Sequence, residues 1–286
     1  MQPLAFEYHA PRNINDAISL LEKYPEGKIL AGGQSLIPLM KLRIVSFPHL
    51  IDVTRIDELR HIRLGSYIRI GAAVTIGELE SKGKIPHGII REAASQIADP
   101  LVRNMGTVGG NISHGDPSND MPAVMIALKA KMKIMGPGGE REVNADDFIV
   151  DSFTTVLEEG EMLAEVEIEG AAARSGGGYV KQRKSAGDFS IAGVASQMSF
   201  DSRGVVRTAG IGLTSVAPKP IRAVKAEAFL VGKELDENVL QEACDLIVDA
   251  SDPAGDYYGS ADFRKKVLWR VAMRALINAK KNAGVN

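Results

Sequence analysis

The chain has 286 residues, of which 45% are hydrophobic and 24% charged, so it can bury one large core or two to three small ones rather than remain disordered. Its 34 basic and 36 acidic residues give a net charge of -2 and are scattered along the chain, which argues against a nucleic-acid partner. We find no apolar run near the roughly 20 residues that a membrane span needs and no signal-peptide pattern at the start, so we expect a cytoplasmic protein, with a peripheral place at the inner face of the membrane left open.

Cysteine and histidine do not predict a metal centre. The single cysteine, Cys244, lies in a helical pattern and excludes an intrachain disulfide and an all-cysteine metal site, so any iron–sulfur cluster must belong to another chain. The histidines lack HxxxH or HxH pairing, so a metal site would need assembly from distant segments, and we predict none. They are His9, His49, His61, His87 and His114.

The first 56 residues alternate between helical and strand patterns, which predicts a small α/β lobe. Asn13 is suited to cap a helix whose apolar residues share one face and which ends near Gly27. The other expected elements are a strand over 28–31, a helix over 36–42 and a strand over 50–53.

A second lobe is expected over residues 57–172 and a third over 173–286, joined by a hinge in the Ala-, Ser- and Gly-rich run 171–178. The second lobe is expected to contain paired strands at 62–64 and 68–70, helices at 75–79, 89–97 and 120–130, and strands at 133–135 and 162–168 around a turn at 136–139. The third is expected to be α+β, with strands at 179–183, 191–200 and 205–213 and helices at 223–230, 237–250 and 261–281.

Two glycine pairs are the strongest candidates for a ligand site. Gly32 and Gly33 stand between a strand and a helix start, a geometry that directs unpaired backbone N–H groups outward at an anionic oxygen. Gly109 and Gly110 follow a hydroxyl residue, and two such turns together could hold a pyrophosphate from both sides. The alternative is that both are ordinary turns, since the chain has 29 glycines. Neither pair fits GxGxxG or GxxxxGK[ST], so another dinucleotide fold is expected.

These motifs resemble the FAD-binding medium subunits of the molybdenum hydroxylases, and the resemblance spans nearly the whole chain. It rests on five ordered segments: FEYHAP at 6–11, AGGQSL at 31–36, DPLVRNMGTVGGN at 99–111, DPSND at 116–120 and KQRKSAGDF at 181–189. The resemblance implies a vanillyl-alcohol-oxidase (PCMH)-type FAD-binding fold, in which two α/β lobes hold an extended FAD and a C-terminal α+β lobe covers the isoalloxazine.

The resemblance also implies which residues bind FAD. The first turn and the second turn would grip the pyrophosphate and ribityl chain, Asp120 would accept hydrogen bonds from flavin hydroxyls, and Leu163 and Lys181 would line the site. The implied cofactor-binding residues are Ile29, Leu30, Ala31, Gly32, Gly33, Gln34, Ser35, Leu36, Ile97, Thr107, Val108, Gly109, Gly110, Asn111, Asp120, Leu163, Lys181 and Phe189.

Three of these residues have ordinary structural alternatives. Phe189 is placed near the flavin ring, where an aromatic face would limit solvent access, or else is a core aromatic. Lys181 would tune the flavin, or else is a solvated strand lysine. Asp120 is expected to serve both the cofactor and the first turn of a helix capped by Ser118 or Asn119. Arg183 and Asp188 are a candidate ion pair.

By resemblance, the chain is an electron-transfer subunit with no catalytic residue of its own. Substrate would be oxidised at a molybdenum–pterin centre in a large partner, and electrons would pass through two-iron clusters of a small partner to FAD and then to quinone, NAD or oxygen, in a dimer of heterotrimers. The carbon monoxide dehydrogenase branch is favoured. The alternatives are a self-sufficient flavin oxidase or reductase of the same fold and a flavin-free scaffold.

Overall fold

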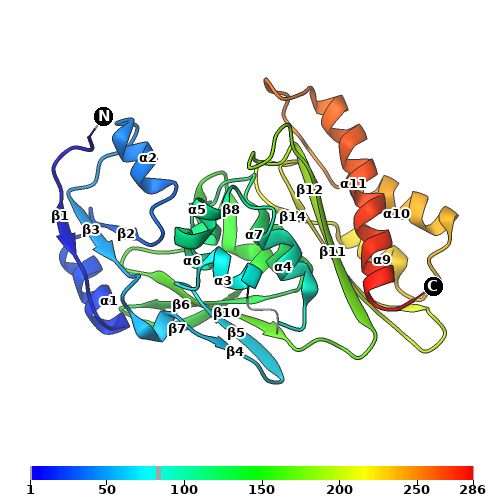
Figure 1. Cartoon of the computed structure of the whole chain (residues 1–286), viewed down its shortest axis with the longest axis horizontal. Coiled ribbons are helices and arrows are strands. Elements are labelled where there is room, and N and C mark those ends of the chain that lie inside the picture. The colour runs from blue at the N-terminus through cyan, green and yellow to red at the C-terminus, as the bar shows by residue number, and fades with distance from the viewer. Residues whose placement is uncertain (1, 82–84, 286) are drawn as a thin grey trace.

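The computed structural model describes residues 2–81 and 85–285, and its elements form three groups, each built around its own sheet (Figure 1). The groups follow one another along the molecule, from the N-terminal strands at one end to the C-terminal helices at the other. Within the described ranges, every helix is too short or too polar to span a bilayer.

The first group is a parallel sheet of order β1-β3-β2 with two helices. Its strands run parallel because each connection contains a helix that returns the chain to the same end of the sheet. Asn13 caps the first helix as predicted, since its Oδ1 accepts a hydrogen bond from the Asp16 N–H at 2.8 Å. The elements are β1 (Glu7–His9), α1 (Ile14–Lys23), β2 (Lys28–Leu30), α2 (Leu36–Lys41) and β3 (His49–Asp52).

The second group is an antiparallel sheet of order β4-β5-β10-β6-β7, with helices α3 to α7 gathered over it (Figure 1). All eight residues of α7 are buried, as expected of a helix that is apolar on nearly every side. The elements are η1 (Asp57–Leu59), β4 (Ile62–Arg63), β5 (Tyr67–Gly71), α3 (Ile76–Ser81), α4 (Gly88–Ala94), α5 (Pro100–Met105), α6 (Val108–Ser113), α7 (Asp120–Ala127), β6 (Lys131–Gly136), β7 (Gly139–Asn144), α8 (Ala145–Phe148), β8 (Ile149–Asp151), β9 (Thr154–Thr155) and β10 (Met162–Glu169).

The third group is a four-stranded antiparallel sheet of order β11-β12-β13-β14, with three helices packed on it. This confirms the expected α+β C-terminal lobe with a sheet of three or more strands. Helix α11 runs along β11 and β12, with α10 beside it (Figure 1). The elements are β11 (Ser175–Gln182), β12 (Ala192–Phe200), β13 (Val206–Thr214), β14 (Ile221–Arg222), α9 (Val224–Leu230), α10 (Glu237–Asp249) and α11 (Ala261–Asn282).

The hydrophobic cores extend across the three sheets. Tyr179 of β11 and Ala195 of β12 belong to the large core of the second group. Met162 and Ala164 of β10 belong to the core of the first group. The predicted lobe boundaries at 56/57 and 172/173 stay predictions, because each of these cores contains residues from both sides of one boundary.

The hinge expected over residues 171–178 is wrong for its second half. Residues 175–178 open strand β11 and pair with β12, from Ser175 opposite Ser199 onward. A Cβ on Gly178 would lie 2.5 Å from the backbone oxygen of Ala275 in α11. Glycine is therefore needed here so that helix α11 can approach the sheet closely, and the glycine-rich composition that suggested flexibility marks a packed interface.

Candidate functional site

The turn after β2 presents backbone donors without acceptors. Gly33 has φ +69°, a left-handed conformation that glycine adopts at little cost, and it redirects the chain from β2 into α2. Among the described residues, no acceptor is found for the N–H groups of residues 32–35. The side chain of Gln34 turns back to donate to the Gly32 carbonyl at 3.1 Å. We call residues 31–35 the donor turn, because its free N–H groups suit an anionic oxygen.

The donor turn lies directly against the second glycine motif. A Cβ on Gly32 would lie 2.1 Å from the Met105 backbone oxygen, and a Cβ on Gly110 would lie 3.4 Å from the Ala31 Cβ. The two segments belong to the first and second groups of elements and are about 75 residues apart in the chain. The structure therefore brings the two predicted glycine turns together, as a two-sided site requires.

The second turn does not carry the free N–H groups that we predicted for it. It is the start of helix α6, with Thr107 as its N-cap. The N–H groups of Val108 and Gly109 donate to the carbonyls of Val74 and Ala72, both at 2.9 Å. Those of Gly110 and Asn111 donate to the Oγ1 and carbonyl oxygen of Thr107, at 3.0 and 2.9 Å. All four donors are used internally, so this part of the prediction is wrong.

Asn111 gives the second turn a hydrogen-bond acceptor that a ligand could use. Its side-chain Oδ1 is buried and has no hydrogen-bond partner within the described ranges. Its backbone carbonyl accepts from the Nδ2 of Asn119 at 2.7 Å, which holds α6 against the start of α7. A buried acceptor without a donor costs about 1–3 kcal/mol, so this atom fits a site in which a ligand hydroxyl or N–H donates to it.

Asp120, at the start of helix α7, and Lys181, in strand β11 of the third sheet, form a buried ion pair. Lys181 Nζ lies 2.8 Å from Asp120 Oδ2, and their side chains are only 1% and 6% exposed. The Tyr179 hydroxyl donates to the other carboxylate oxygen of Asp120. Burial raises the pKa of Asp120 and raises that of Tyr179, while the Lys181 cation opposes the rise at Asp120. The solvated-lysine alternative for Lys181 is excluded by this burial.

Tyr179 is the residue of this network that the sequence did not single out. The sequence placed it at the start of a strand over 179–183, but nothing in the spacing showed that it would join the core or that its hydroxyl would reach α7. Tyr179 and Asp120 are 59 positions apart, and their hydrogen bond depends on how β11 packs against α7. The periodicity of a sequence does not predict such packing.

The remaining predicted residues fall into two kinds of environment. Ile97 and Leu163 are buried, at 8% and 4% exposure, and pack in the core of the second group. Phe189 is 60% exposed, which excludes the core-aromatic alternative. The predicted ion pair of Arg183 and Asp188 is wrong: within the described chain, Arg183 donates to the Gln96 carbonyl at 3.1 Å and Asp188 accepts from the Ser185 N–H at 2.9 Å.

His114 and Asp116 lie in the segment that connects α6 to α7. His114 Nε2 lies 4.0 Å from Asp116 Oδ2, and the Phe153 ring meets the imidazole edge-on at 5.3 Å. Burial lowers the pKa of His114, which favours the neutral imidazole. Asp116 accepts from the Ser118 N–H at 2.8 Å, so it serves the turn before α7. Asn119 is the N-cap residue of α7.

Cys244 and a cavity beside β11 lie away from the glycine turns. Cys244 is fully buried in the core of the third group, and burial raises the pKa of its thiol to about 12. A neutral, enclosed thiol cannot form a covalent link to a cofactor. A cavity of about 630 Å³ lies between α4 and β11, lined by residues such as Arg91, Glu92 and Gln197 and by none of the predicted flavin residues.

Comparison with known proteins identifies the class to which this fold and site belong. Residues 4–168 match the FAD binding domain in molybdopterin dehydrogenase, and residues 178–279 match the CO dehydrogenase flavoprotein C-terminal domain. The chain therefore belongs to the family of FAD-binding subunits of the molybdopterin dehydrogenases, which are oxidoreductases, and it has the PCMH-type FAD-binding fold that the sequence motifs indicated.

Individual relatives cover the whole chain. The carbon monoxide dehydrogenase medium chain of Hydrogenophaga pseudoflava is 41% identical over 96% of this chain and 97% of its own length. The medium chain of the same enzyme from Afipia carboxidovorans is 41% identical over 99% of each chain. In the solved structure of the Hydrogenophaga pseudoflava enzyme that lacks the Mo-pyranopterin moiety of its cofactor, one chain matches with a TM-score of 0.95 and 43% identity, covering 99% of each chain.

Proposed function

We propose that this chain is the FAD-carrying medium subunit of a molybdenum hydroxylase of the carbon monoxide dehydrogenase type. It takes electrons from two-iron clusters of a small partner subunit, while a large partner subunit holds the molybdenum–pterin centre. Bound FAD would accept electrons singly from the clusters and deliver them in pairs to quinone, NAD or oxygen. The donor turn is the observation that carries the flavin assignment.

The donor turn suits the diphosphate of FAD. Four consecutive N–H groups, from Gly32 to Ser35, find no acceptor within the described chain, and the turn that carries them lies against Met105 of the second group. Backbone donors stabilise phosphate oxygens without a cluster of arginines, which agrees with the balanced charge of -2. In the adjoining second turn, the orphan Oδ1 of Asn111 would accept from a ribityl or ribose hydroxyl. The residues present therefore fit the cofactor.

The other predicted flavin residues are proposed in supporting positions. Asp120 and Lys181 hold α7 and β11 together behind the second turn. Ile97 and Leu163 supply apolar surface in the adjoining core. Phe189 stands exposed at the third sheet, where it is free to cover the isoalloxazine ring.

Partner subunits are required because this chain holds one cysteine, and that cysteine is buried in a core. A two-iron cluster needs four ligands, usually cysteine thiolates, so the clusters belong to another chain. We infer a heterotrimer with a small iron–sulfur subunit and a large molybdopterin subunit, paired into a dimer of heterotrimers. A cytoplasmic location remains the expectation from sequence.

Titration of the purified chain with FAD tests the proposal. We expect the flavin absorption bands to shift and its fluorescence to fall, with saturation at one equivalent. Gly32→Val should abolish binding, since its side chain would enter the space of the Met105 carbonyl. Gly138→Ala is the matched control, because a Cβ there meets nothing within 4 Å. A wild-type chain that binds no flavin alone or with its partners would support the scaffold alternative.

The oxidase alternative has less support. It requires a base over the flavin and a substrate cavity next to it, whereas the cavity of about 630 Å³ is lined by other residues. Oxygen consumption by the flavin-loaded chain, with and without reduced small subunit, separates the two functions. Turnover that depends on the reduced iron–sulfur partner supports electron transfer, and turnover of an organic substrate by this chain alone supports the oxidase.

A further inference from the structure

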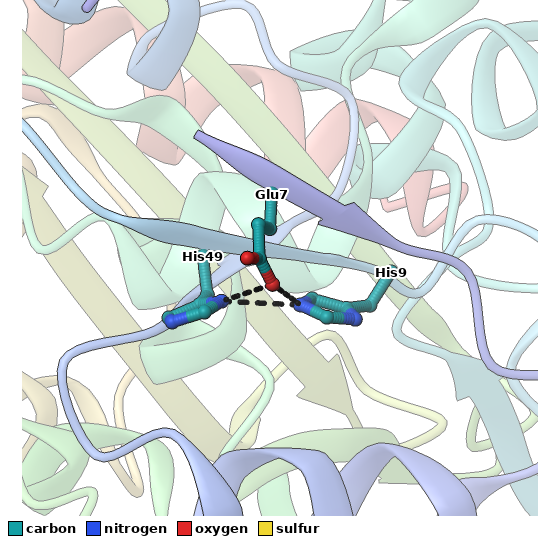
Figure 2. Close-up of side chains that lie close together, drawn as sticks. All are labelled: Glu7, His9 and His49. Carbon is teal, nitrogen blue, oxygen red and sulfur yellow. Dashed lines mark hydrogen bonds and ion pairs between the residues drawn. The ribbon is translucent and has the colours of Figure 1, made fainter. Parts of the chain in front are cut away.

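Three metal-ligating side chains meet on one face of the first sheet (Figure 2). Parallel pairing of β1 with β3 sets Glu7 opposite His49, and His9 follows two residues later on the same face as Glu7. Glu7 and His9 therefore approach His49 from a segment 40 or more residues away, so no local HxxxH pattern announces the cluster. It is the long-range assembly that the scattered histidines would have required.

The distances between the three atoms suit a small divalent ion. His9 Nε2 lies 3.2 Å from His49 Nδ1, and Glu7 Oε2 lies 3.5 Å from His49 Nδ1 and 3.9 Å from His9 Nε2. A point equidistant from these three atoms is about 2.1 Å from each, which is the length of a zinc–imidazole or zinc–carboxylate bond. A single N–H between the two rings satisfies one nitrogen pair, whereas an ion would engage all three ligand atoms at once.

The imidazole rings are held in place before any ion binds. Tyr24, the C-cap residue of α1, stacks on His49 with ring centroids 3.9 Å apart and on His9 with centroids 4.9 Å apart. The two histidine side chains are about one-fifth exposed, while Glu7 is 69% exposed. The nitrogens are thus shielded and oriented, and the carboxylate side of the cluster is open to water.

We propose that Glu7, His9 and His49 bind a zinc ion, with water in the fourth position. Two imidazoles and one carboxylate form the mixed nitrogen and oxygen set that zinc accepts, whereas magnesium and calcium prefer oxygen ligands alone. The ion would fasten the N-terminal strand β1 to β3, because ligands from both strands would share it. This replaces the expectation, drawn from sequence spacing, that the chain holds no metal.

The proposed zinc site is separate from the flavin site. His49 opens β3 beside Leu50, whose partner Lys28 opens β2, whereas the donor turn follows the last residue of β2. The two sites therefore lie at opposite ends of the parallel strands. Zinc binding can be tested without FAD, and its failure would leave the flavin proposal untouched.

Calorimetric titration of the untagged, chelator-treated full chain with zinc tests the site. We expect one equivalent to bind, a rise in the thermal unfolding temperature, and, with Co²⁺ instead, the visible absorption of a tetrahedral cobalt site. Glu7→Gln and His49→Ala should each weaken zinc binding by at least about 100-fold, since losing a direct ligand should cost no less than the 10–100-fold typical of outer-shell partners.

His61→Ala is the matched control. His61 Nε2 pairs with Glu165 at 2.6 Å and is similarly exposed, but Arg69 and Lys133 also lie within 4.0 Å of that carboxylate and disfavour a cation. This variant should bind zinc like the wild type. Glu7 is exposed, so Glu7→Gln should fold and leaves both stacked histidines in place. This variant therefore decides the matter if His49→Ala fails to fold. Absence of zinc binding in the wild type, or undiminished binding in Glu7→Gln, would overturn the proposal and leave a plain histidine hydrogen bond.

Discussion

The turn that follows β2 and the turn that opens α6 lie against each other, yet their backbone N–H groups have different partners. Those of residues 32–35 find no acceptor within the described chain, while those of residues 108–111 all donate to neighbouring protein oxygens. The first turn leaves its donors free, as the proposed flavin site requires, while the second turn, with the Asp120–Lys181 pair behind it, forms a frame that carries Asn111. Two glycine pairs of similar sequence can thus perform different tasks, and hydrogen-bond partners distinguish them.

The frame behind the second turn should be the most sensitive to substitution. Lys181→Met leaves the Asp120 carboxylate buried without its cation, which should lower the free energy of unfolding by about 3–5 kcal/mol. Urea denaturation measures this loss. The control Lys131→Met removes an exposed pair with Glu142 and should cost no more than about 1 kcal/mol. Equal effects of the two variants would show that the buried pair does not hold the frame.

Contact between the two turns is the next most sensitive feature. Gly32→Val forces a side chain against the Met105 carbonyl, and such overpacking typically costs about 1–3 kcal/mol of stability. The same change should remove FAD binding, because it displaces the donor turn from Asn111. Denaturation and flavin fluorescence are measured on one preparation. Full flavin affinity in a destabilised Gly32→Val chain would mean that the donor turn acts without its neighbour.

Asn111 offers a sharper contrast between ligand binding and stability. Asn111→Leu should leave the stability of the flavin-free chain nearly unchanged, since the lost Oδ1 has no partner there. Flavin affinity should fall by roughly 10- to 100-fold, the equivalent of about 1–3 kcal/mol for an acceptor that pairs only with the cofactor. Fluorescence titration gives the affinity. The opposite pattern, lost stability with intact affinity, would make Asn111 part of the frame alone.

His114 should add a modest pH dependence to the second turn. Burial lowers its pKa below the ordinary 6.5, so the folded state binds the proton less readily than the unfolded state. Its contribution to stability is complete above pH 6.5 and is lost as the pH falls through the folded-state pKa. His114→Gln should therefore lose less stability than the wild type between about pH 7 and pH 5. Parallel slopes in urea denaturation at these pH values would exclude this role.

Phe189 should have the smallest effect on stability and a visible one on the flavin. It is 60% exposed, so Phe189→Ala should change the free energy of unfolding by no more than about 0.5 kcal/mol. If its ring shields bound FAD, iodide should quench flavin emission more strongly in the variant. Leu101→Ala, at a side chain 79% exposed on α5, is the matched control and should leave quenching unchanged.

Local patterns in the sequence predicted the elements well where one face of a helix or strand is buried. The cap at Asn13, the β6–β7 turn and the three helices of the C-terminal lobe all follow from periodicity and turn residues. Short helices with glycine or proline, such as α5 and α6, were not predicted, because packing against other segments outweighs their weak propensity.

The candidate site was predictable only in part. A glycine pair between a strand and a helix correctly indicated the donor turn, because that signal is local. Two other features depend on contacts between distant segments. The Val108 and Gly109 N–H groups donate to the carbonyls of Val74 and Ala72, and the Tyr179 hydroxyl donates to Asp120. Such contacts leave no spacing in the sequence, which is also why the pairing of Glu7 with His49 was not expected.

The cores that join neighbouring sheets determine which fragments of this protein could fold on their own. Backbone oxygens of Ala123 and Ala127 in α7 lie 2.0 Å from where a Cβ would stand on Gly212 and Gly210 of β13, so these two elements meet almost without side chains between them. A fragment ending at residue 172 would expose α7, and a fragment beginning there would expose β13. The second and third groups should therefore fold as one unit, although they look like separate lobes in the ribbon drawing (Figure 1).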